Sequence, residues 1–131
     1  MTRSELREHI FHMLFQVDFN PEEEQIEQMD LYVDGLGEIQ DKDKAYIEKK
    51  YQDVISHISE IDASLNEQTE GWKTSRMNKV DLTILRLAIF EMKWDEDVPA
   101  GVAINEAVEL AKKYSSDDGP AFINGVLAKF A

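Results

Sequence analysis

The sequence predicts an all-α protein of about seven helices, arranged as two small packed helical bundles. Apolar residues recur at spacings of three and four along most of the 131-residue chain, which is the period of an amphipathic helix. Only three prolines and six glycines interrupt this pattern, and no Asn-Gly hairpin lies between segments of alternating polarity. We expect one domain over residues 1–131, with an N-terminal lobe over about residues 1–68 and a C-terminal lobe over about residues 69–131.

Three helices are expected in the first half of the chain, over about residues 3–18, 20–35 and 41–61. The first has one apolar stripe, formed by Leu6, Ile10, Met13, Leu14 and Val17. The second is expected to begin with Asn20 as the capping residue and Pro21 in the first helical position, where the missing N–H of proline costs no hydrogen bond. The third is expected to bend or break before a short segment around residues 63–65.

Three more helices are expected in the second half, over about residues 77–94, 100–114 and 121–130. The first of these is apolar on most of its sides, as is typical of a central, buried helix. The second is expected to bury an apolar stripe made of Val102, Ile104, Ala107, Val108 and Ala111. Loops over residues 95–99 and 115–120 contain proline or capping residues and separate the three helices.

The chain carries a formal net charge of −13, and almost all of it lies in the middle third. Residues 21–71 hold four lysines and fifteen acidic residues, whereas the segments before and after are each close to neutral. A strongly acidic total argues against a general nucleic-acid coat or a membrane-surface protein, both of which need positive charge. Because salt screens charges beyond about 8 Å, the acidic segment still leaves room for a local basic patch elsewhere.

The sequence contains no arrangement typical of a catalytic, metal or cofactor site. There is no cysteine, which excludes disulfides, thiol nucleophiles and cysteine-bound metals and fits a reducing cytoplasm. His9 and His12 could share a helix face as metal ligands, but no second His–acid pair accompanies them, which favours surface histidines. Phosphate loops are missing, and no apolar run is long enough to span a membrane. We expect a cytoplasmic protein that is not an enzyme, binds no metal or cofactor and has no membrane attachment.

Two arginines, Arg3 and Arg7, lie on one flank of the first predicted helix at an i, i+4 spacing. Phe11 and Phe15 continue the same ladder. Cations followed by aromatic rings suit single-stranded RNA, because guanidinium groups bind phosphates and rings stack on unpaired bases. Alternatively, the arginines pair with acidic residues such as Glu8 and the rings fill the core. The spacing alone favours this second interpretation.

Arg86 lies within the apolar run of the central predicted helix. A buried guanidinium needs carboxylate partners, because an unpaired charge in the interior is strongly destabilising. Glu91 and Glu106 are the candidate partners. We therefore expect an internal, structural ion pair at Arg86 in preference to a ligand-binding role.

Four segments in the second half of the chain resemble the NusB family of transcription antitermination factors. They are Trp72-x3-Arg76, DLTILRLAIFE over residues 81–91, VAINEAVELAK over residues 102–112 and FINGVL over residues 122–127. The order and spacing of the last two segments are highly specific. The first half of the chain resembles the family only in its helical pattern and its opening helix.

The resemblance implies an all-helical, non-catalytic protein that binds the boxA element of ribosomal RNA leader transcripts as a heterodimer with ribosomal protein NusE. Such a complex joins RNA polymerase and other Nus factors. Carried over residue by residue, the resemblance implies RNA contacts from Arg3, Arg7, Phe15, Phe122 and Asn124 and partner contacts from Asp81 and Asp118. Ser4 and Glu5 stand where the family usually has further arginines, and Phe15 stands where it often has tyrosine.

Two other functions remain open at this point. The net charge of −13 also suits a helical protein-interaction module without an RNA role. A NusB-like domain also precedes the catalytic domain of some ribosomal RNA cytosine methyltransferases, so the chain could be a stand-alone relative of that domain. Because it has neither a cysteine nucleophile nor a glycine-rich cofactor strand, it cannot be that enzyme by itself.

Overall fold

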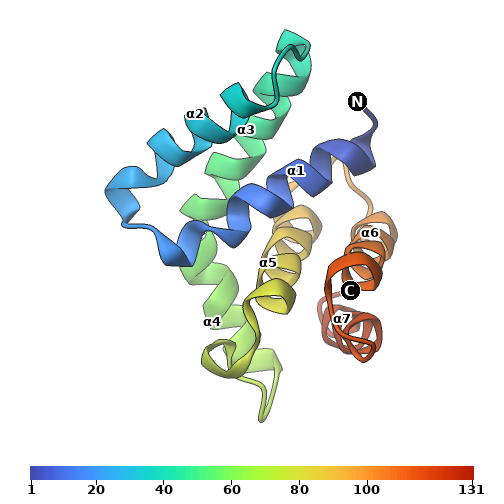
Figure 1. The fold of residues 1–131 in the computed structure, drawn as a ribbon. Coiled ribbons are helices and arrows are strands. Elements are labelled where there is room, and N and C mark those ends of the chain that lie inside the picture. Colours follow the sequence, from blue (N-terminus) through green and yellow to red (C-terminus); the bar gives the residue numbers. More distant parts are fainter. The chain divides into compact units, whose positions relative to one another are not determined.

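The computed structural model describes residues 1–131 and contains seven α-helices and no β-strand (Figure 1). The helices are α1 (Arg3–Phe15), α2 (Gln25–Gly35), α3 (Asp41–Ser56), α4 (Ile58–Gln68), α5 (Lys79–Trp94), α6 (Ala100–Tyr114) and α7 (Gly119–Ala128). Three short 3-10 turns join them: η1 (Val17–Phe19), η2 (Glu22–Glu24) and η3 (Thr74–Arg76). The predicted all-α fold class is confirmed.

The chain divides into two compact units, Met1–Ser56 with α1 to α3 and His57–Ala131 with α4 to α7. The junction predicted from the sequence lies near residue 68, after α4, whereas the observed junction lies before α4. In the structure α4 belongs to the second unit because it packs against α5. An ion pair between Asp62 on α4 and Arg86 on α5 strengthens this contact.

In the first unit, α1 packs against α3 (Figure 1) and begins with a capping box. The backbone N–H of Glu5 donates to Thr2 Oγ1 at 3.1 Å, and Glu5 Oε1 accepts from the backbone N–H of Thr2 at 2.9 Å. Hydrogen bonds from the backbone and the side chain of Thr2 to the Glu5 carboxylate favour its ionised form and lower the pKa of this group. The predicted apolar stripe is buried at all five positions, Leu6, Ile10, Met13, Leu14 and Val17.

The start of the second helix differs from the prediction. Asn20 does not cap it: its side-chain Nδ2 donates instead to the backbone carbonyl of Gln16 at 3.2 Å. Pro21 has extended backbone angles (φ −56°, ψ 147°), so the chain enters the 3-10 turn η2 first and α2 begins only at Gln25. Tyr51 on α3 is buried, which raises its pKa, and its hydroxyl donates to the carbonyl of Gln25 at 3.4 Å.

The third predicted helix ends earlier than expected, at Ser56, and His57 (φ −111°, ψ 3°) separates α3 from α4. The Ser56 hydroxyl donates to the backbone carbonyl of Asp53 at 2.8 Å. Such bonds to the preceding turn often bend a helix, which agrees with a break directly after Ser56. α4 is consequently a full helix where the sequence predicted only a short segment.

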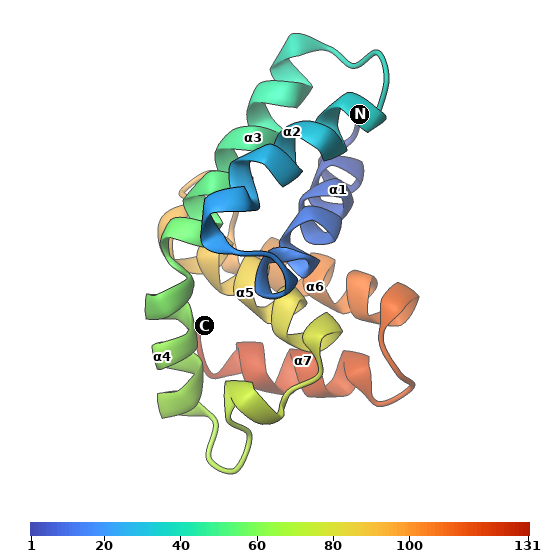
Figure 2. The same cartoon turned by 60° about the vertical axis from the view of Figure 1, so that its left-hand side comes forward.

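In the second unit, α5 is the central helix and packs against α4, α6 and α7 (Figure 2). Every residue from Asp81 to Glu91 is buried, as the all-round apolar sequence predicted. Val102 was expected in the core but is 44% exposed. The buried stripe of α6 instead consists of Ala103, Ala107, Leu110 and Ala111, whose spacing follows one face of a helix.

Candidate nucleic-acid and partner interface

Arg3 stacks on an aromatic ring from the neighbouring helix of the first unit. Its Cζ lies 4.2 Å from the centroid of the Tyr46 ring, which α3 supplies. Lys50, one turn further along α3, donates from Nζ to the Tyr46 hydroxyl at 2.9 Å. Arg3 is exposed and no carboxylate pairs with it, so stacking on Tyr46 leaves its N–H groups available to a phosphate.

The other residues of the predicted ladder on α1 differ in exposure. Arg7 is only 5% exposed and Phe11 is also buried. Phe15 is half-buried, and its ring centroid lies 5.5 Å from that of the exposed Phe19. Arg3 and Phe15 therefore reach the surface. The burial of Arg7 gives its guanidinium a part in stability, while its predicted RNA contact stays a prediction.

The histidines singled out in the sequence lie on the first unit without a set of metal ligands around them. His9 Nδ1 is 2.9 Å from the Tyr32 hydroxyl, and the His12 ring lies beside Phe11. No group of three or more potential ligands gathers in the structure.

No helix is both long enough and apolar enough to cross a bilayer.

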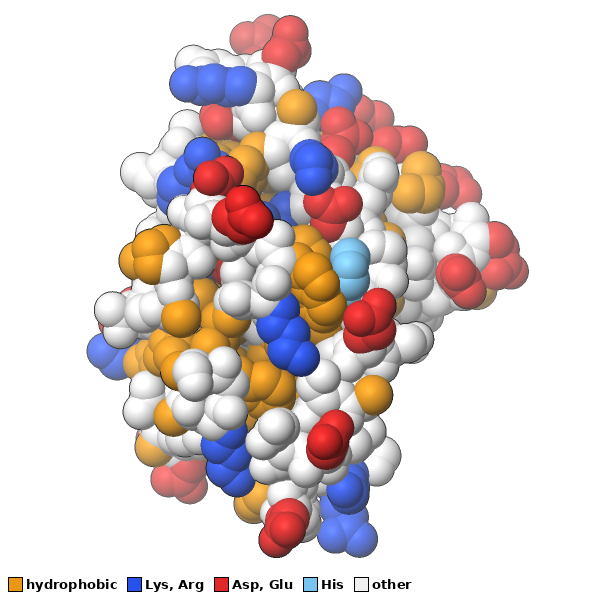
Figure 3. Space-filling view, turned by 180° about the vertical axis from the view of Figure 1, so that it is seen from behind, with side chains coloured by type: hydrophobic (Ala, Val, Ile, Leu, Met, Phe, Trp, Pro, Cys, Tyr) orange, Lys and Arg blue, Asp and Glu red, His pale blue; other side chains and the backbone are white.

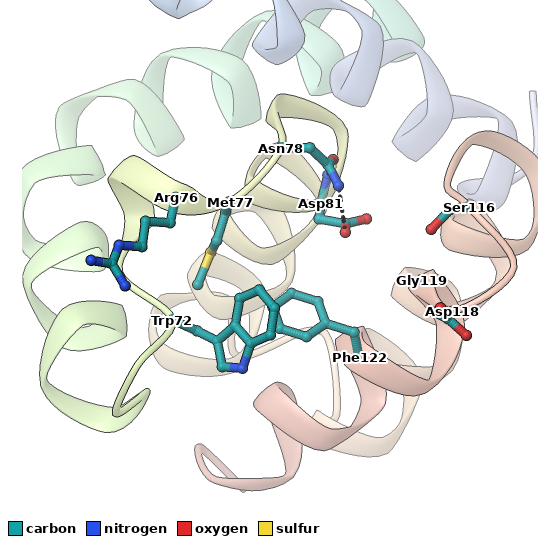
Figure 4. Close-up of a pocket in the computed structure, with 9 residues that line it drawn as sticks. All are labelled: Trp72, Arg76, Met77, Asn78, Asp81, Ser116, Asp118, Gly119 and Phe122. Carbon is teal, nitrogen blue, oxygen red and sulfur yellow. Dashed lines mark hydrogen bonds between the residues drawn. The ribbon is translucent and has the colours of Figure 1, made fainter.

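A pocket of about 280 Å³ opens in the second unit (Figure 4). Residues from three segments line it: the stretch around η3, the first turn of α5, and the α6–α7 loop with the start of α7. They are Trp72, Arg76, Met77, Asn78, Asp81, Ser116, Asp118, Gly119 and Phe122. Three residues predicted as RNA or partner contacts, Asp81, Asp118 and Phe122, thus share one pocket, and Asn124 is exposed on α7 nearby in the chain.

One end of this pocket is apolar and aromatic. The rings of Trp72 and Phe122 meet edge to face with centroids 5.3 Å apart, and Met77 lies beside them (Figure 4). Trp72 is 55% exposed, whereas Phe122 is half-buried. Trp72 and Arg76 were identified in the sequence only as parts of a family pattern and not as functional residues. A tryptophan next to a glycine in a polar stretch was the signal that could have indicated them.

The other end is polar and organised around Asp81. Asn78 caps α5 by accepting from the backbone N–H of Asp81 at 2.8 Å, and its Nδ2 donates to Asp81 Oδ2 at 2.9 Å. Ser115, which ends α6, donates from Oγ to Asp81 Oδ1 at 2.6 Å. Asp81 is only 6% exposed. Through its bonds to Asn78 and Ser115, its carboxylate joins the start of α5 to the end of α6. Its predicted partner contact stays a prediction, as does that of the exposed Asp118.

Gly119 is required where α7 begins beside this network. A Cβ at this position would lie 2.5 Å from the Ser115 Cβ, still closer to the Ser115 Oγ, and 3.7 Å from Asp81 Oδ1. Real Cβ atoms do not approach others so closely. The first turn of α7 can therefore pack against Ser115 only because residue 119 has no side chain.

Arg86 forms the internal ion pair that the sequence predicted, with a partner that it did not name. Its Nε donates to Asp62 Oδ1 at 2.9 Å and its Nη2 donates to Asp62 Oδ2 at 2.7 Å, which is a bidentate geometry. Glu91 is buried on the same helix. The expected pairing with Glu91 and Glu106 stays a prediction beside this observed bond.

On the face drawn in Figure 3, lysine and arginine side chains lie singly or in small groups between acidic and uncharged ones. This distribution agrees with the strongly negative total charge. A large basic surface of the kind that coats nucleic acid is not seen on this face. Contacts with RNA would have to come from a few well-placed cations and aromatic rings.

Comparisons with known proteins agree along the whole chain. The sequence matches the NusB family over residues 4–131. It is 53% identical to the transcription antitermination protein NusB of Agathobacter rectalis, with all of both chains covered. The solved structure of T. maritima NusB superimposes with a TM-score of 0.90 at 30% identity, covering 100% of this chain and 91% of the other.

A chain in a crystal structure of antitermination factors NusB and NusE in complex with dsRNA also matches. Its TM-score is 0.84 at 25% identity, and 98% of this chain and 96% of the other are covered. Fold and relatives together define the class, which is that of small all-helical transcription antitermination factors. Within this class the chain belongs to the NusB family, and the family resemblance seen in the sequence is confirmed.

Proposed function

We propose that this chain binds boxA-type single-stranded RNA of ribosomal RNA leader transcripts together with ribosomal protein NusE. In this role it would connect the transcript indirectly to RNA polymerase and other Nus factors, in the cytoplasm and without catalysis. The observation that carries the proposal is the match of nearly the whole chain to a structure that holds NusB, NusE and dsRNA.

Each unit supplies part of the proposed contacts. In the first unit these are Arg3, Arg7 and Phe15, of which the exposed Arg3 is the best placed to bind a phosphate. In the second unit Phe122 and Asn124 are proposed to contact RNA, and Asp81 and Asp118 to contact the protein partner. Because so few cations are involved, we expect a salt slope of only about −1.5 to −3 in log–log units, at about −0.7 per phosphate contact.

A binding titration tests the proposed function. Fluorescence anisotropy of labelled boxA-type RNA is compared with that of a scrambled RNA of equal composition, each with and without NusE. We expect tighter binding to the boxA-type RNA and a further gain when NusE is present, because the partner adds surface and positive charge. Equal affinity for both RNAs under all conditions would instead support a protein-interaction module, which the net charge of −13 also suits.

Replacing Arg3 with alanine should weaken RNA binding several-fold and make the salt slope shallower by about 0.7, since one phosphate contact is lost. Replacing Tyr46 with leucine should have much of the same effect, because the guanidinium then loses the ring that holds it. Tyr46→Phe, which keeps the ring, is the matched control and should bind as the unchanged protein does.

Thermal denaturation separates this effect from a loss of fold. Arg3→Ala removes an exposed cation–π contact of about 0.5–1 kcal/mol, so the melting temperature should change little. Arg7→Ala removes a buried guanidinium and should lower the melting temperature clearly. An unchanged salt slope in Arg3→Ala would remove Arg3 from the RNA contacts.

A further inference from the structure

We propose that the pocket between Trp72 and Phe122 binds one unstacked nucleobase of the RNA, with Trp72 as the stacking surface and Arg76 beside it for an adjacent phosphate. The proposal rests on the proposed function and assigns roles to two residues that neither the motifs nor the relatives' names assign. It follows from the exposure of Trp72, the rigidity of its segment, and the size and charge of the pocket.

The exposure of Trp72 is the first observation. A tryptophan is normally well covered in a folded protein, yet this side chain is 55% exposed. It meets Phe122 edge to face at an interplanar angle of 61°, so the two rings are not stacked in parallel. A tryptophan that is more than half exposed beside a second aromatic ring suits the stacking of an unpaired base.

The segment that carries Trp72 is held firmly although its side chain is exposed. The backbone N–H of Trp72 donates to the Thr69 carbonyl at 3.2 Å, and the Thr69 hydroxyl lies 2.6 Å from the Trp72 carbonyl. Gly71 adopts φ +79°, the left-handed conformation that this tight turn needs and that glycine supplies without strain. Asn66 at the end of α4 accepts from the backbone N–H of Thr74 at 2.8 Å. The backbone that carries the stacking surface is therefore held in place before a ligand arrives, which lowers the entropy lost on binding.

The pocket's size suits a single base. Its volume of about 280 Å³ lies just below the range of drug-sized small-molecule sites, about 300–1,000 Å³, as suits a smaller ligand. The aromatic end offers the rings and Met77, and the polar end offers Ser116 and Asn78 to the donors and acceptors on a base edge (Figure 4). Flat apolar faces with a polar edge are the features of a nucleobase.

The accessible charges favour a base over a basic side chain from a protein partner. Of the two carboxylates in the pocket, Asp81 is buried and already accepts from Asn78 and Ser115. Asp118 is thus the one exposed carboxylate, and the exposed Arg76 opposes it with the opposite charge. A pocket that is neutral in its accessible groups has no strong attraction for a lysine or arginine, whereas Arg76 can bind the phosphate of a nucleotide.

The two tryptophans of the chain make a direct test possible, because Trp94→Phe leaves Trp72 as the only tryptophan. Titration of this variant with boxA-type RNA should quench the fluorescence of Trp72, with saturation at the RNA concentration that saturates the anisotropy. Trp72→Leu should weaken RNA binding by about 5- to 150-fold, the loss expected for one stacked base. Trp94→Leu is the matched control, since Trp94 is also exposed but lies outside the pocket, and it should bind RNA normally.

A second variant tests whether the Arg76 guanidinium binds a phosphate of the RNA. Arg76→Ala should make the salt slope of RNA binding shallower by about 0.7, a change that a purely structural role of Arg76 would not produce. Circular dichroism of each variant shows whether it is folded, and the fluorescence of Trp94→Phe does not depend on substituting any pocket residue.

The outcomes are distinct. RNA binding by anisotropy with unchanged Trp72 fluorescence would overturn the pocket proposal and leave the proposed function intact. A response of Trp72 to NusE alone, without a response to RNA, would make the pocket a protein-binding site and also overturn it. Absence of RNA binding even with NusE present would overturn the proposed function and this proposal together.

Discussion

Replacing Gly119 with alanine is expected to destabilise the protein by about 3 kcal/mol, because the added Cβ would lie 2.5 Å from the Ser115 Cβ. Overpacking of this kind costs about 1–3 kcal/mol. Ser115 must move to make room, and its hydroxyl then leaves Asp81, whose buried carboxylate loses a hydrogen bond of 2.6 Å. Bonds to charged groups contribute about 1.5–3 kcal/mol, so the two effects together make this a severe single substitution.

Chemical or thermal denaturation measures the loss, and Gly125 on the same helix provides a matched control. A Cβ at Gly125 would meet nothing within 4 Å, so Gly125→Ala should leave stability unchanged or raise it by up to about 1 kcal/mol. Adding Ser115→Gly to Gly119→Ala removes the atoms that collide and should recover part of the loss. If Gly119→Ala and Gly125→Ala denature at the same midpoint, the close packing of α7 on Ser115 is not what requires glycine.

Much of the fold could be predicted because apolar residues recur at helical spacing along the chain. Five apolar positions between residues 6 and 17 predicted the buried stripe that runs along α1 into η1, and the largely apolar sequence predicted the central position of α5. Helix ends were harder, because capping depends on backbone geometry that several side chains can satisfy. Asn20 looked like a cap but bonds to the preceding segment, and Ser56 bonds to Asp53 where a continuous helix was expected.

In the candidate site, contacts between residues that lie far apart in the sequence could not be predicted. The i, i+4 spacing correctly placed Arg3 and Arg7 on one flank of α1. Which of the two is buried depends on residues from other parts of the chain that pack against them. Tyr46, forty-three positions after Arg3, provides the ring that holds its guanidinium at the surface, whereas Arg7 is buried. Likewise the partner of Arg86 was sought on its own and the following helix, and Asp62 lies 24 residues before it on α4. Periodicity carries no information about such pairs.

Breaking the Arg86–Asp62 pair is expected to cost as much as any substitution in the second unit. The Arg86 side chain is 8% exposed and that of Asp62 is 23% exposed, so Asp62→Ala leaves a guanidinium in the interior without this carboxylate. Losing one partner of a buried pair costs about 3–5 kcal/mol, because the remaining charge keeps its desolvation penalty. Arg86→Met should cost less, since the carboxylate that it leaves behind is closer to water.

A double-mutant cycle in urea, measured on Asp62→Leu, Arg86→Met and the variant with both changes, separates the pair from the packing around it. Asp62→Leu with Arg86→Met replaces both charges by apolar groups and should recover most of the loss, since such exchanges are often close to neutral. RNA affinity, measured where each variant is folded, should not change, because neither side chain lines the pocket. Glu106→Gln in the same assay tests the pairing that the sequence predicted. An unchanged midpoint in Asp62→Ala would mean that other groups satisfy Arg86 and that the bond to Asp62 adds nothing to the stability of α4 on α5.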